Sequence, residues 1–264
     1  MRFAVIGDSG SGDKAAFETA AQLERFQHST NFNFVLMLGD NLLGGSSSPS
    51  DYEKKFNQPY RPLLNSGVKF YAALGNHDNP NEMAYAPFNM NGNRYYTFVQ
   101  SEVQFFVLDS NYMDRMQLEW LRTELEKSTS PWKIVYFHHP IYSSAKRHGS
   151  DTDLRTVLEP LFLKYGVNVA MGGHDHVYER TVPQHGIQYF VMGSSGMLRS
   201  GDIENDSLKA AGFDSNQSFL LMEVAGDELY YQAISRTGQT VDSGRFTRSN
   251  ANPTSGGGGG AKMK

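Results

Sequence analysis

The sequence predicts an α/β fold in which mixed β-sheets are layered with helices. Strand-like apolar runs alternate with amphipathic helical segments along most of the chain, and two pairs of runs are joined by short turns typical of hairpins. At 264 residues the chain is long enough to bury a sizeable core, and no internal repeat or linker divides it. We therefore expect one domain over residues 1–248, followed by a flexible Gly-rich tail at residues 249–264.

The elements follow one another in a regular order. Strand-like runs occur at residues 2–8, 32–40, 68–78, 94–100, 103–110, 132–140, 167–176, 187–196 and 239–246. Apolar residues at helical spacing predict helices at residues 13–27, from about Asp51, at 113–128 and at 153–166. Ser101-Glu102 separates two runs as a hairpin turn would, and Gly226-Asp227 divides the run at residues 218–235 into a second hairpin.

Composition excludes several classes of site. The formal net charge of −4 gives no sign of a nucleic-acid-binding surface, and no apolar run is long enough for a membrane span. Because the chain has no cysteine, disulfides, thiolate metal sites and a cysteine nucleophile are excluded. The first residues enter a strand-like run at once, so we expect no signal peptide in the sequence as given. The compartment stays open: the cytoplasm, or the periplasm or exterior if a leader had been removed.

Polar side chains collect where five of the strand-like runs end. The endings are Gly7-Asp8, Gly39-Asp40, Gly75-Asn76-His77-Asp78, His138-His139-Pro140 and Gly172-Gly173-His174-Asp175-His176. In open α/β sheets, ligands bind beyond the carboxyl ends of the strands, so these residues are expected at one edge.

Each ending taken alone has a simpler interpretation. A Gly-Asp pair after a strand is usually a cap or a turn, and a single asparagine is more often a turn residue. Together, however, they would bury carboxylates and imidazoles side by side, which is expensive without a cation. Carboxylate, amide oxygen and imidazole suit Mn²⁺, iron or Zn²⁺. One carboxylate shared between two ions would set them about 3.5–4 Å apart, a spacing that supports displacement at phosphorus.

The motifs resemble those of the calcineurin-like metallophosphoesterases, and most closely the purple acid phosphatases of the tartrate-resistant type. The matching segments span positions 7 to 180 and read GDSG, GDNLL, GNHD, FHHP, HG at His148-Gly149 and GGHDHVYER. The resemblance implies a four-layer αββα sandwich with a dinuclear metal centre at one edge. It also implies a metal-dependent phosphoester hydrolase that uses a metal-bound hydroxide on a small phosphoester substrate.

The resemblance assigns roles to individual residues. The first metal would take Asp8, Asp40 and His176, and the second would take Asp40, Asn76, His138 and His174, with Asp40 bridging. His77 and His148 would contact the phosphate or protonate the leaving group.

Two positions depart from the family pattern. Position 10 holds glycine where most members outside the purple acid group have histidine, and position 43 holds leucine where purple acid phosphatases have a metal-binding tyrosine. The first metal therefore lacks one protein ligand. A tyrosinate stabilises Fe³⁺, so its absence predicts divalent ions, Mn²⁺, Fe²⁺ or Zn²⁺, in preference to Fe³⁺.

Several questions stay open at this level. The chain is interpreted as a phosphomonoesterase, with a phosphodiesterase or nucleotide hydrolase, or a non-catalytic metal- or phosphate-binding relative, as alternatives. His139 is interpreted as a packed neighbour of the ligands, since the family motif uses the first histidine of His-x-Pro. The loop at residues 193–196 is interpreted as either a wall of the site or a plain turn.

Overall fold

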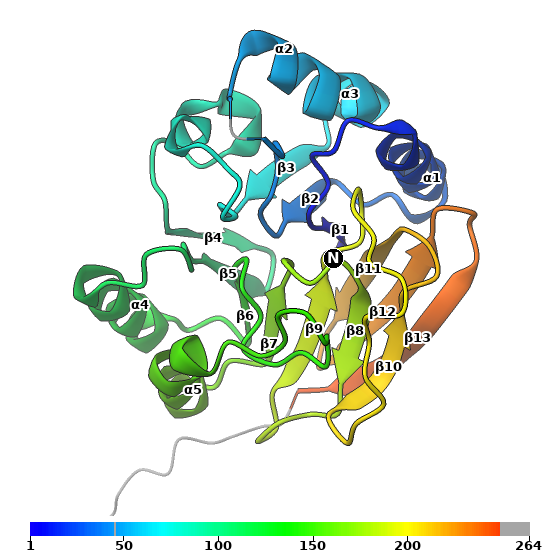
Figure 1. Cartoon of the computed structure of the whole chain (residues 1–264). Helices are drawn as coiled ribbons and strands as arrows, with labels where there is room; N and C mark the ends of the chain where they lie inside the picture. The colour runs from blue at the N-terminus through cyan, green and yellow to red at the C-terminus, as the bar shows by residue number, and fades with distance from the viewer. Residues whose placement is uncertain (45, 249–264) are drawn as a thin grey trace, which may run out of the picture.

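The computed structural model describes residues 1–44 and 46–248, so the tail expected at residues 249–264 lies outside the described residues. Two mixed β-sheets pack face to face, and helices cover the outer face of each (Figure 1). This is the four-layer αββα sandwich that the motifs predicted. Within the described part of the chain, no helix combines the length and apolarity that crossing a bilayer would need.

The first sheet combines strands from the N-terminal and C-terminal parts of the chain. Its order is β13-β12-β11-β1-β2-β3. The bounds are β1 Arg2–Ile6, β2 Phe34–Met37, β3 Lys69–Ala72, β11 Ser218–Ala225, β12 Glu228–Ser235 and β13 Thr240–Thr247. β1, β2 and β3 run parallel, whereas β11 pairs with β1 antiparallel and leads into the antiparallel β12 and β13.

The second sheet comes from the middle of the chain. Its order is β10-β8-β9-β7-β6-β5-β4. The bounds are β4 Tyr96–Gln100, β5 Val103–Val107, β6 Trp132–Tyr136, β7 Val169–Gly172, β8 Tyr178–Thr181, β9 Gln188–Met192 and β10 Lys209–Phe213. β5, β6, β7 and β9 run parallel. The parallel strands of both sheets end at the same rim of the sandwich, and the polar strand endings meet there (Figure 1).

Apolar side chains fill three layers. Residues from the inner faces of both sheets form the central core, where the rings of Phe3 and Phe34 stack 5.3 Å apart. The outer face of the first sheet packs against α1 (Lys14–Thr30) and α3 (Gln58–Asn65), and that of the second packs against α4 (Arg115–Lys127) and α5 (Thr152–Tyr165). Each apolar helix stripe is thus buried against a sheet, which fixes the frame that carries the rim.

The predicted helices and hairpins are present with small differences. The helix expected from about Asp51 begins with α2 (Pro49–Tyr52) and continues through a π-helical stretch, η1 (Glu53–Asn57), into α3. The sequence did not reveal β8, β10 or the 3₁₀ turns η2 (Pro80–Ala84) and η3 (Ala86–Phe88). β10 reads KAAGF, whose small residues give little strand signal, and β8 follows the histidine motif with no apolar run of its own.

Candidate metal centre

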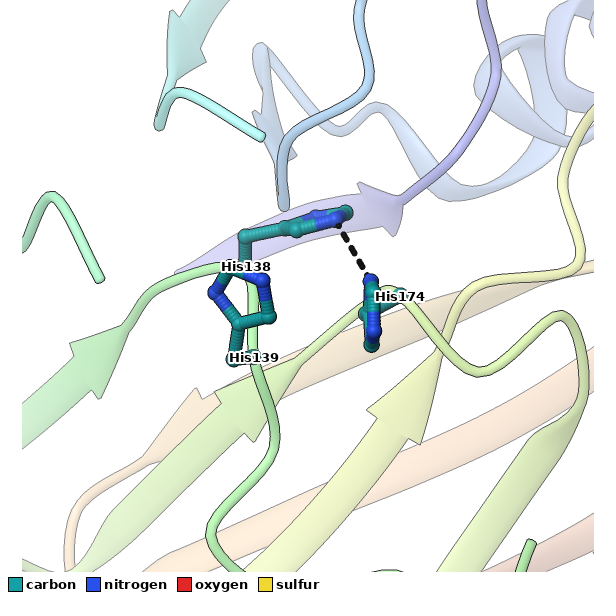
Figure 2. A group of neighbouring side chains, drawn as sticks. All are labelled: His138, His139 and His174. Atoms are coloured by element: carbon teal, nitrogen blue, oxygen red, sulfur yellow. Dashed lines mark hydrogen bonds between the residues drawn. The ribbon is translucent and has the colours of Figure 1, made fainter. Parts of the chain in front are cut away.

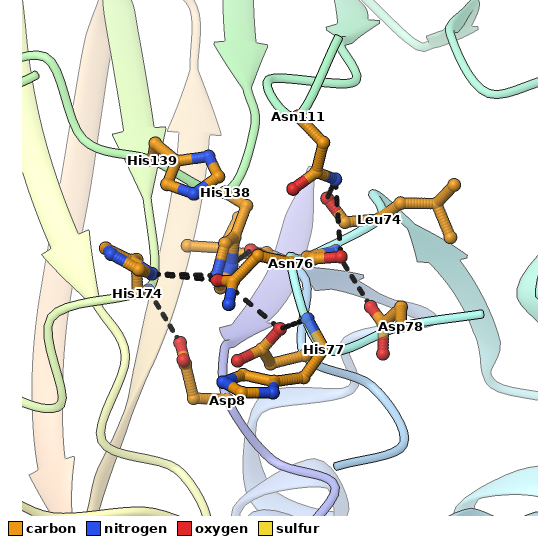
Figure 3. Close-up of polar contacts among 12 residues, drawn as sticks. Asp8, Leu74, Asn76, His77, Asp78, Asn111, His138, His139 and His174 are labelled. Carbon is orange, nitrogen blue, oxygen red and sulfur yellow. Dashed lines mark hydrogen bonds and ion pairs between the residues drawn. The ribbon is translucent and has the colours of Figure 1, made fainter. Parts of the chain in front are cut away.

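The six predicted ligands come from five loops at the common rim. Asp8, Asp40 and Asn76 follow β1, β2 and β3 of the first sheet, while His138 follows β6 and the pair His174 and His176 follows β7 of the second. The close-up in Figure 3 shows Asp8, Asn76, His138 and His174 converging from both sheets. Residues up to 168 positions apart in the chain therefore share one small volume, as the strand-end argument predicted.

Three of these residues have a strained backbone. Asp8, Asp40 and His174 have φ values of 51°, 52° and 66°, in the left-handed region that residues other than glycine seldom adopt. Such strain costs on the order of 1–3 kcal/mol per residue and clusters at functional sites. The strained conformations turn the side chains inward, where Asp8 and Asp40 are almost wholly buried.

One group of ligand atoms comes from Asp8, Asp40 and His176, which lie within 4.8 Å of one another. Within this group, His176 Nε2 lies 3.4 Å from Asp8 Oδ1. Asp8 Oδ1 is buried and has no hydrogen-bond partner among the described residues, while Oδ2 accepts a bond from the backbone N–H of His174 at 2.8 Å. A buried carboxylate oxygen without a donor fits a cation as its missing partner.

A second group lies directly beside the first. Asn76 Oδ1 is 2.9 Å from His138 Nε2 and 3.0 Å from His174 Nδ1, and these two nitrogens are 3.2 Å apart. Asp40 Oδ1 is 3.5 Å from His138 Nε2, so Asp40 belongs to both groups. Atoms that surround one ion at about 2.0–2.2 Å are separated by distances of this size. The residues present therefore fit two neighbouring ions with Asp40 between them.

Electrostatics favours the same interpretation. Burial, and then repulsion from Asp40, raises the pKa of Asp8 well above its ordinary value, and burial also raises the pKa of Asp40. Burial, and then His138, lowers the pKa of His174 to about 2, while burial followed by Arg199 lowers that of His176 to about 4. Neutral imidazoles next to crowded carboxylates are the donor state that a metal requires. Bound cations would reverse the penalty on both carboxylates.

Glycines allow the loops to approach the ligands. A Cβ on Gly39, where φ is +94°, would lie 2.6 Å from His138 Nδ1, and one on Gly173 would lie 2.6 Å from Asp8 Oδ2. A Cβ on Gly193 would lie 2.9 Å from the same Asp8 oxygen. The loop at residues 193–196 is thus a wall of the site, which resolves the alternative that the sequence left open.

The comparisons with known proteins identify the family. A family model described as calcineurin-like phosphoesterase matches residues 1–178. The chain belongs to this family. Rabbit (Oryctolagus cuniculus) tartrate-resistant acid phosphatase type 5 is 27% identical over 242 residues, which covers 75% of this chain and 74% of the relative. Arabidopsis thaliana purple acid phosphatase 15 is 27% identical over 252 residues, covering 77% of this chain and 46% of the relative.

Solved structures agree on the fold. The purple acid phosphatase PPD1 from yellow lupin (Lupinus luteus) seeds is similar at a TM-score of 0.80 and 19% identity, covering 95% of this chain and 54% of that one. GAP50, described as the anchor in the inner membrane complex of Plasmodium, also has a TM-score of 0.80, at 20% identity, covering 96% and 90%. These structures show the fold, while the family match and the acid phosphatase relatives show a metal-dependent hydrolase of phosphoric esters similar to purple acid phosphatases.

The two predicted acid histidines of this phosphoesterase flank the ligands. His77 is exposed, and its backbone N–H donates to Asp40 Oδ1 at 3.0 Å. His148 is also exposed, and its ring lies 4.3 Å from that of His174, centroid to centroid. A hydrogen bond also holds the loop that precedes His148, because Ser143 Oγ donates to Asp175 Oδ2 at 2.6 Å. The loops that carry the two exposed imidazoles are thus each anchored by a hydrogen bond to a carboxylate.

Two carboxyl groups, half-buried Asp78 and buried Glu82, support the first-sheet side of the site. Asp78 accepts bonds from the Asn41 side chain and the Gly75 N–H, both at 2.8 Å, and from the Leu42 N–H at 3.0 Å. Burial, and then Asp78, raises the pKa of the wholly buried Glu82 to about 9, so Glu82 is protonated at neutral pH. Sequence reasoning missed Glu82, which lies in the turn η2 that the sequence did not reveal.

His139 stands beside His138 and His174 (Figure 2). The ligand atoms of the three rings lie within 4.8 Å of one another, so distance alone would admit His139 as a ligand. Ser110 Oγ accepts a bond from the His139 backbone N–H at 3.0 Å and lies 2.8 Å from His139 Nδ1. Among the described residues, Nδ1 is the acceptor within reach of the Ser110 hydroxyl proton. In the tautomer in which Nδ1 accepts the Ser110 hydroxyl proton, the proton of neutral His139 lies on Nε2, and that nitrogen donates and does not bind metal.

The departure at position 10 has a structural reason, and that at position 43 lies in the same loop. A Cβ on Gly10 would collide with the backbone carbonyl of Asn41, so this loop has no room for a histidine at position 10. The Leu43 N–H donates to the Gly10 carbonyl at 3.1 Å, and the Leu43 carbonyl accepts a bond from Lys55 Nζ. Leu43 therefore braces the loop and offers no side-chain donor to an ion.

Proposed function

We propose that this phosphoesterase is a phosphomonoesterase whose centre holds two divalent ions, Mn²⁺, Fe²⁺ or Zn²⁺. The observation that carries the proposal is the position of Asp40 between two neighbouring groups of oxygen and imidazole donors. The names of the relatives, tartrate-resistant and purple acid phosphatases, support monoester substrates. The absence of a phenolate at Leu43 favours divalent ions, because an anionic hard donor would have favoured Fe³⁺.

The ions, when bound, supply Lewis acidity toward phosphoryl oxygens and acidify a coordinated water. The chain supplies the rest. Asp40 fixes the spacing of the two positions, and the neutral imidazoles of His138, His174 and His176 leave the centre with a net positive charge for the substrate. His77 and His148 donate hydrogen bonds to the phosphoryl oxygens, and one of them protonates the leaving alkoxide at its ester oxygen. No covalent intermediate is needed, since the nucleophile is water.

The test combines metal content with a pair of substrates. Protein loaded with Mn²⁺ or Zn²⁺ should contain two ions per chain by elemental analysis and hydrolyse p-nitrophenyl phosphate faster than bis-p-nitrophenyl phosphate. A preference for the diester would instead indicate a phosphodiesterase or nucleotide hydrolase. One ion per chain at saturation would refute the dinuclear assignment.

A further inference from the structure

A hollow of ≈ 550 Å³ opens beside the candidate metal centre and has no role in the reaction described so far. Asn76 and His139 line its inner end, so it is continuous with the site. Leu74, Pro80, Met83 and Tyr112 form an apolar wall, and we name this space the Tyr112 hollow. Tyr112 is 68% exposed, so its ring is accessible to a bound group. The volume is that of a small-molecule pocket.

The charges that line the Tyr112 hollow are mostly negative. Asp78, Asp109 and Asp151 line it, against one guanidinium, that of Arg94. Arg94 is already engaged, since it lies 3.2 Å from Asp109 and 2.5 Å from Asp114 and also donates to the Tyr112 carbonyl at 3.2 Å. The hollow therefore offers no unpaired cation to a second anionic group, and its carboxylates would repel one.

A second hollow, of ≈ 390 Å³, lies on the other side of His139 and differs in character. It is lined by Arg147, His148 and His174, and it shares His139 and Asp151 with the Tyr112 hollow. His139 therefore lies at the junction of the two spaces. Of the two spaces, the apolar wall makes the Tyr112 hollow the one suited to an organic group.

We propose that the Tyr112 hollow is the leaving-group subsite, and that it selects phosphoesters of uncharged or cationic alcohols with an aromatic or other apolar body over esters bearing a second anion. This inference rests on the proposed function, because the phosphoryl group must lie at the metal centre. With the phosphate there, an organic group that extends past Asn76 and His139 enters the Tyr112 hollow and packs against Tyr112 and Met83. Burial of an apolar body against Tyr112 stabilises the complex, and Asp151, for which no ion pair occurs among the described residues, opposes a further negative charge.

The test measures binding, so that it does not depend on turnover. Benzylphosphonates replace the ester oxygen of an aryl phosphate with CH₂ and are not hydrolysed. We would titrate Mn²⁺-loaded protein by calorimetry with benzylphosphonate, its 4-aminomethyl and 4-carboxy derivatives, and methylphosphonate. The 4-carboxy ligand should bind about tenfold more weakly than benzylphosphonate, as for one added like-charge interaction near a protein surface, and the 4-aminomethyl ligand at least as tightly. Equal affinity for the carboxy and unsubstituted ligands would overturn the proposal.

Two variants locate the effect, each with a matched control. Asp151 caps α5, and asparagine caps equally well, so Asp151→Asn removes the charge and keeps the helix. It should reduce the loss of affinity of the 4-carboxy ligand about threefold or more, whereas Asp153→Asn, which does not line the Tyr112 hollow, should not.

The second variant tests the aromatic ring. Tyr112→Ala should weaken the binding of benzylphosphonate about five- to tenfold and leave that of methylphosphonate unchanged. Met116→Ala, at a side chain 72% exposed and outside the hollow, should change neither.

Failure of the subsite and failure of the proposed function give different results. Selective binding without hydrolysis of any monoester would refute the phosphomonoesterase while the subsite stands. Hydrolysis of p-nitrophenyl phosphate with no loss of benzylphosphonate affinity in Tyr112→Ala would refute the subsite while the enzyme stands. Absence of binding by every phosphonate to the metal-loaded protein would refute the subsite as well.

Discussion

The two sheets contribute different chemistry to the candidate metal centre. Every predicted ligand from the first sheet is an oxygen donor, namely Asp8, Asp40 and Asn76, whereas every one from the second is an imidazole, namely His138, His174 and His176. Each ligand group draws on both sheets. The comparison teaches that neither sheet alone could hold an ion in this geometry, so that metal binding and the packing of the two sheets are coupled.

Removal of Asp40, the oxygen donor that both ligand groups share, should have the largest effect. Asp40→Ala should lower kcat on the order of 10⁴-fold or more and lose both ions, because each ligand group becomes one donor short. His176→Ala, a change on the imidazole side, should keep one ion, since the group around Asn76 stays complete. Elemental analysis and kinetics on the purified variants check both. Two ions per chain in Asp40→Ala would disprove the bridge.

The next largest effect concerns His77 and His148, the two predicted acid histidines, which are not expected to bind an ion. His77→Ala and His148→Ala should each keep both ions, and the one that acts as general acid should lower kcat by about 10²–10⁴-fold for alkyl esters. The loss should be smaller for p-nitrophenyl phosphate, whose leaving group needs little protonation. Steady-state kinetics on both esters separates the roles, and a residue whose loss is equal for the two is not the acid.

The residues that support the oxygen ligands and those that support the histidine ligands also differ, and the pH dependence of stability should show this difference. Hydroxyl–carboxylate bonds support the histidine side, but the oxygen side rests on Glu82, whose pKa burial raises to about 9. Because this folded pKa lies above the unfolded value of about 4.5, Glu82 contributes stability below pH 4.5 that is lost progressively as pH rises toward 9.

Glu82→Gln keeps the shape and stays neutral. At pH 7–8 the metal-free variant should therefore be more stable than the metal-free parent by about 1–3 kcal/mol, and near pH 4 the two should converge. Urea unfolding at several pH values measures this. Glu126→Gln, on the exposed face of α4, is the control and should shift stability by less than about 0.5 kcal/mol. A constant difference between Glu82→Gln and the parent at all pH values would contradict the raised pKa.

The smallest expected effect concerns position 43, which lies on the side of the site that supplies oxygen ligands. With Leu43 in place, the protein should be colourless or pale, be activated by added divalent metal, be inhibited by chelators and work best near neutral pH. Leu43→Tyr with ferric iron supplied should introduce a visible tyrosinate band, with little effect on fold. A strong band in the parent protein would mean that another tyrosine binds the ion.

Much of this site could be predicted because its ligands follow glycine-marked ends of apolar strands, where local sequence and sheet topology agree. The residues that sequence reasoning missed act through long-range pairs. Ser110 and His139 are 29 positions apart, and the role of Glu82 depends on burial beside Asp78, which no local pattern reports. The hollow beside Tyr112 is likewise assembled from separate loops, so its charge balance appears only in three dimensions.

The strand order also sets when the site can form. β1 lies between β2 and β11, so one edge of β1 stays unpaired until residues 218–225 have been synthesised. β13 then ties the layers together, since Asp242 accepts bonds from Tyr178 at 2.7 Å and Arg180 at 2.8 Å, just past the His174–His176 loop. Asp8 and Asp40 are made first yet depend on the last strands for their frame. A ribosome-bound chain ending at residue 217 should therefore fail to retain metal although it contains every predicted ligand.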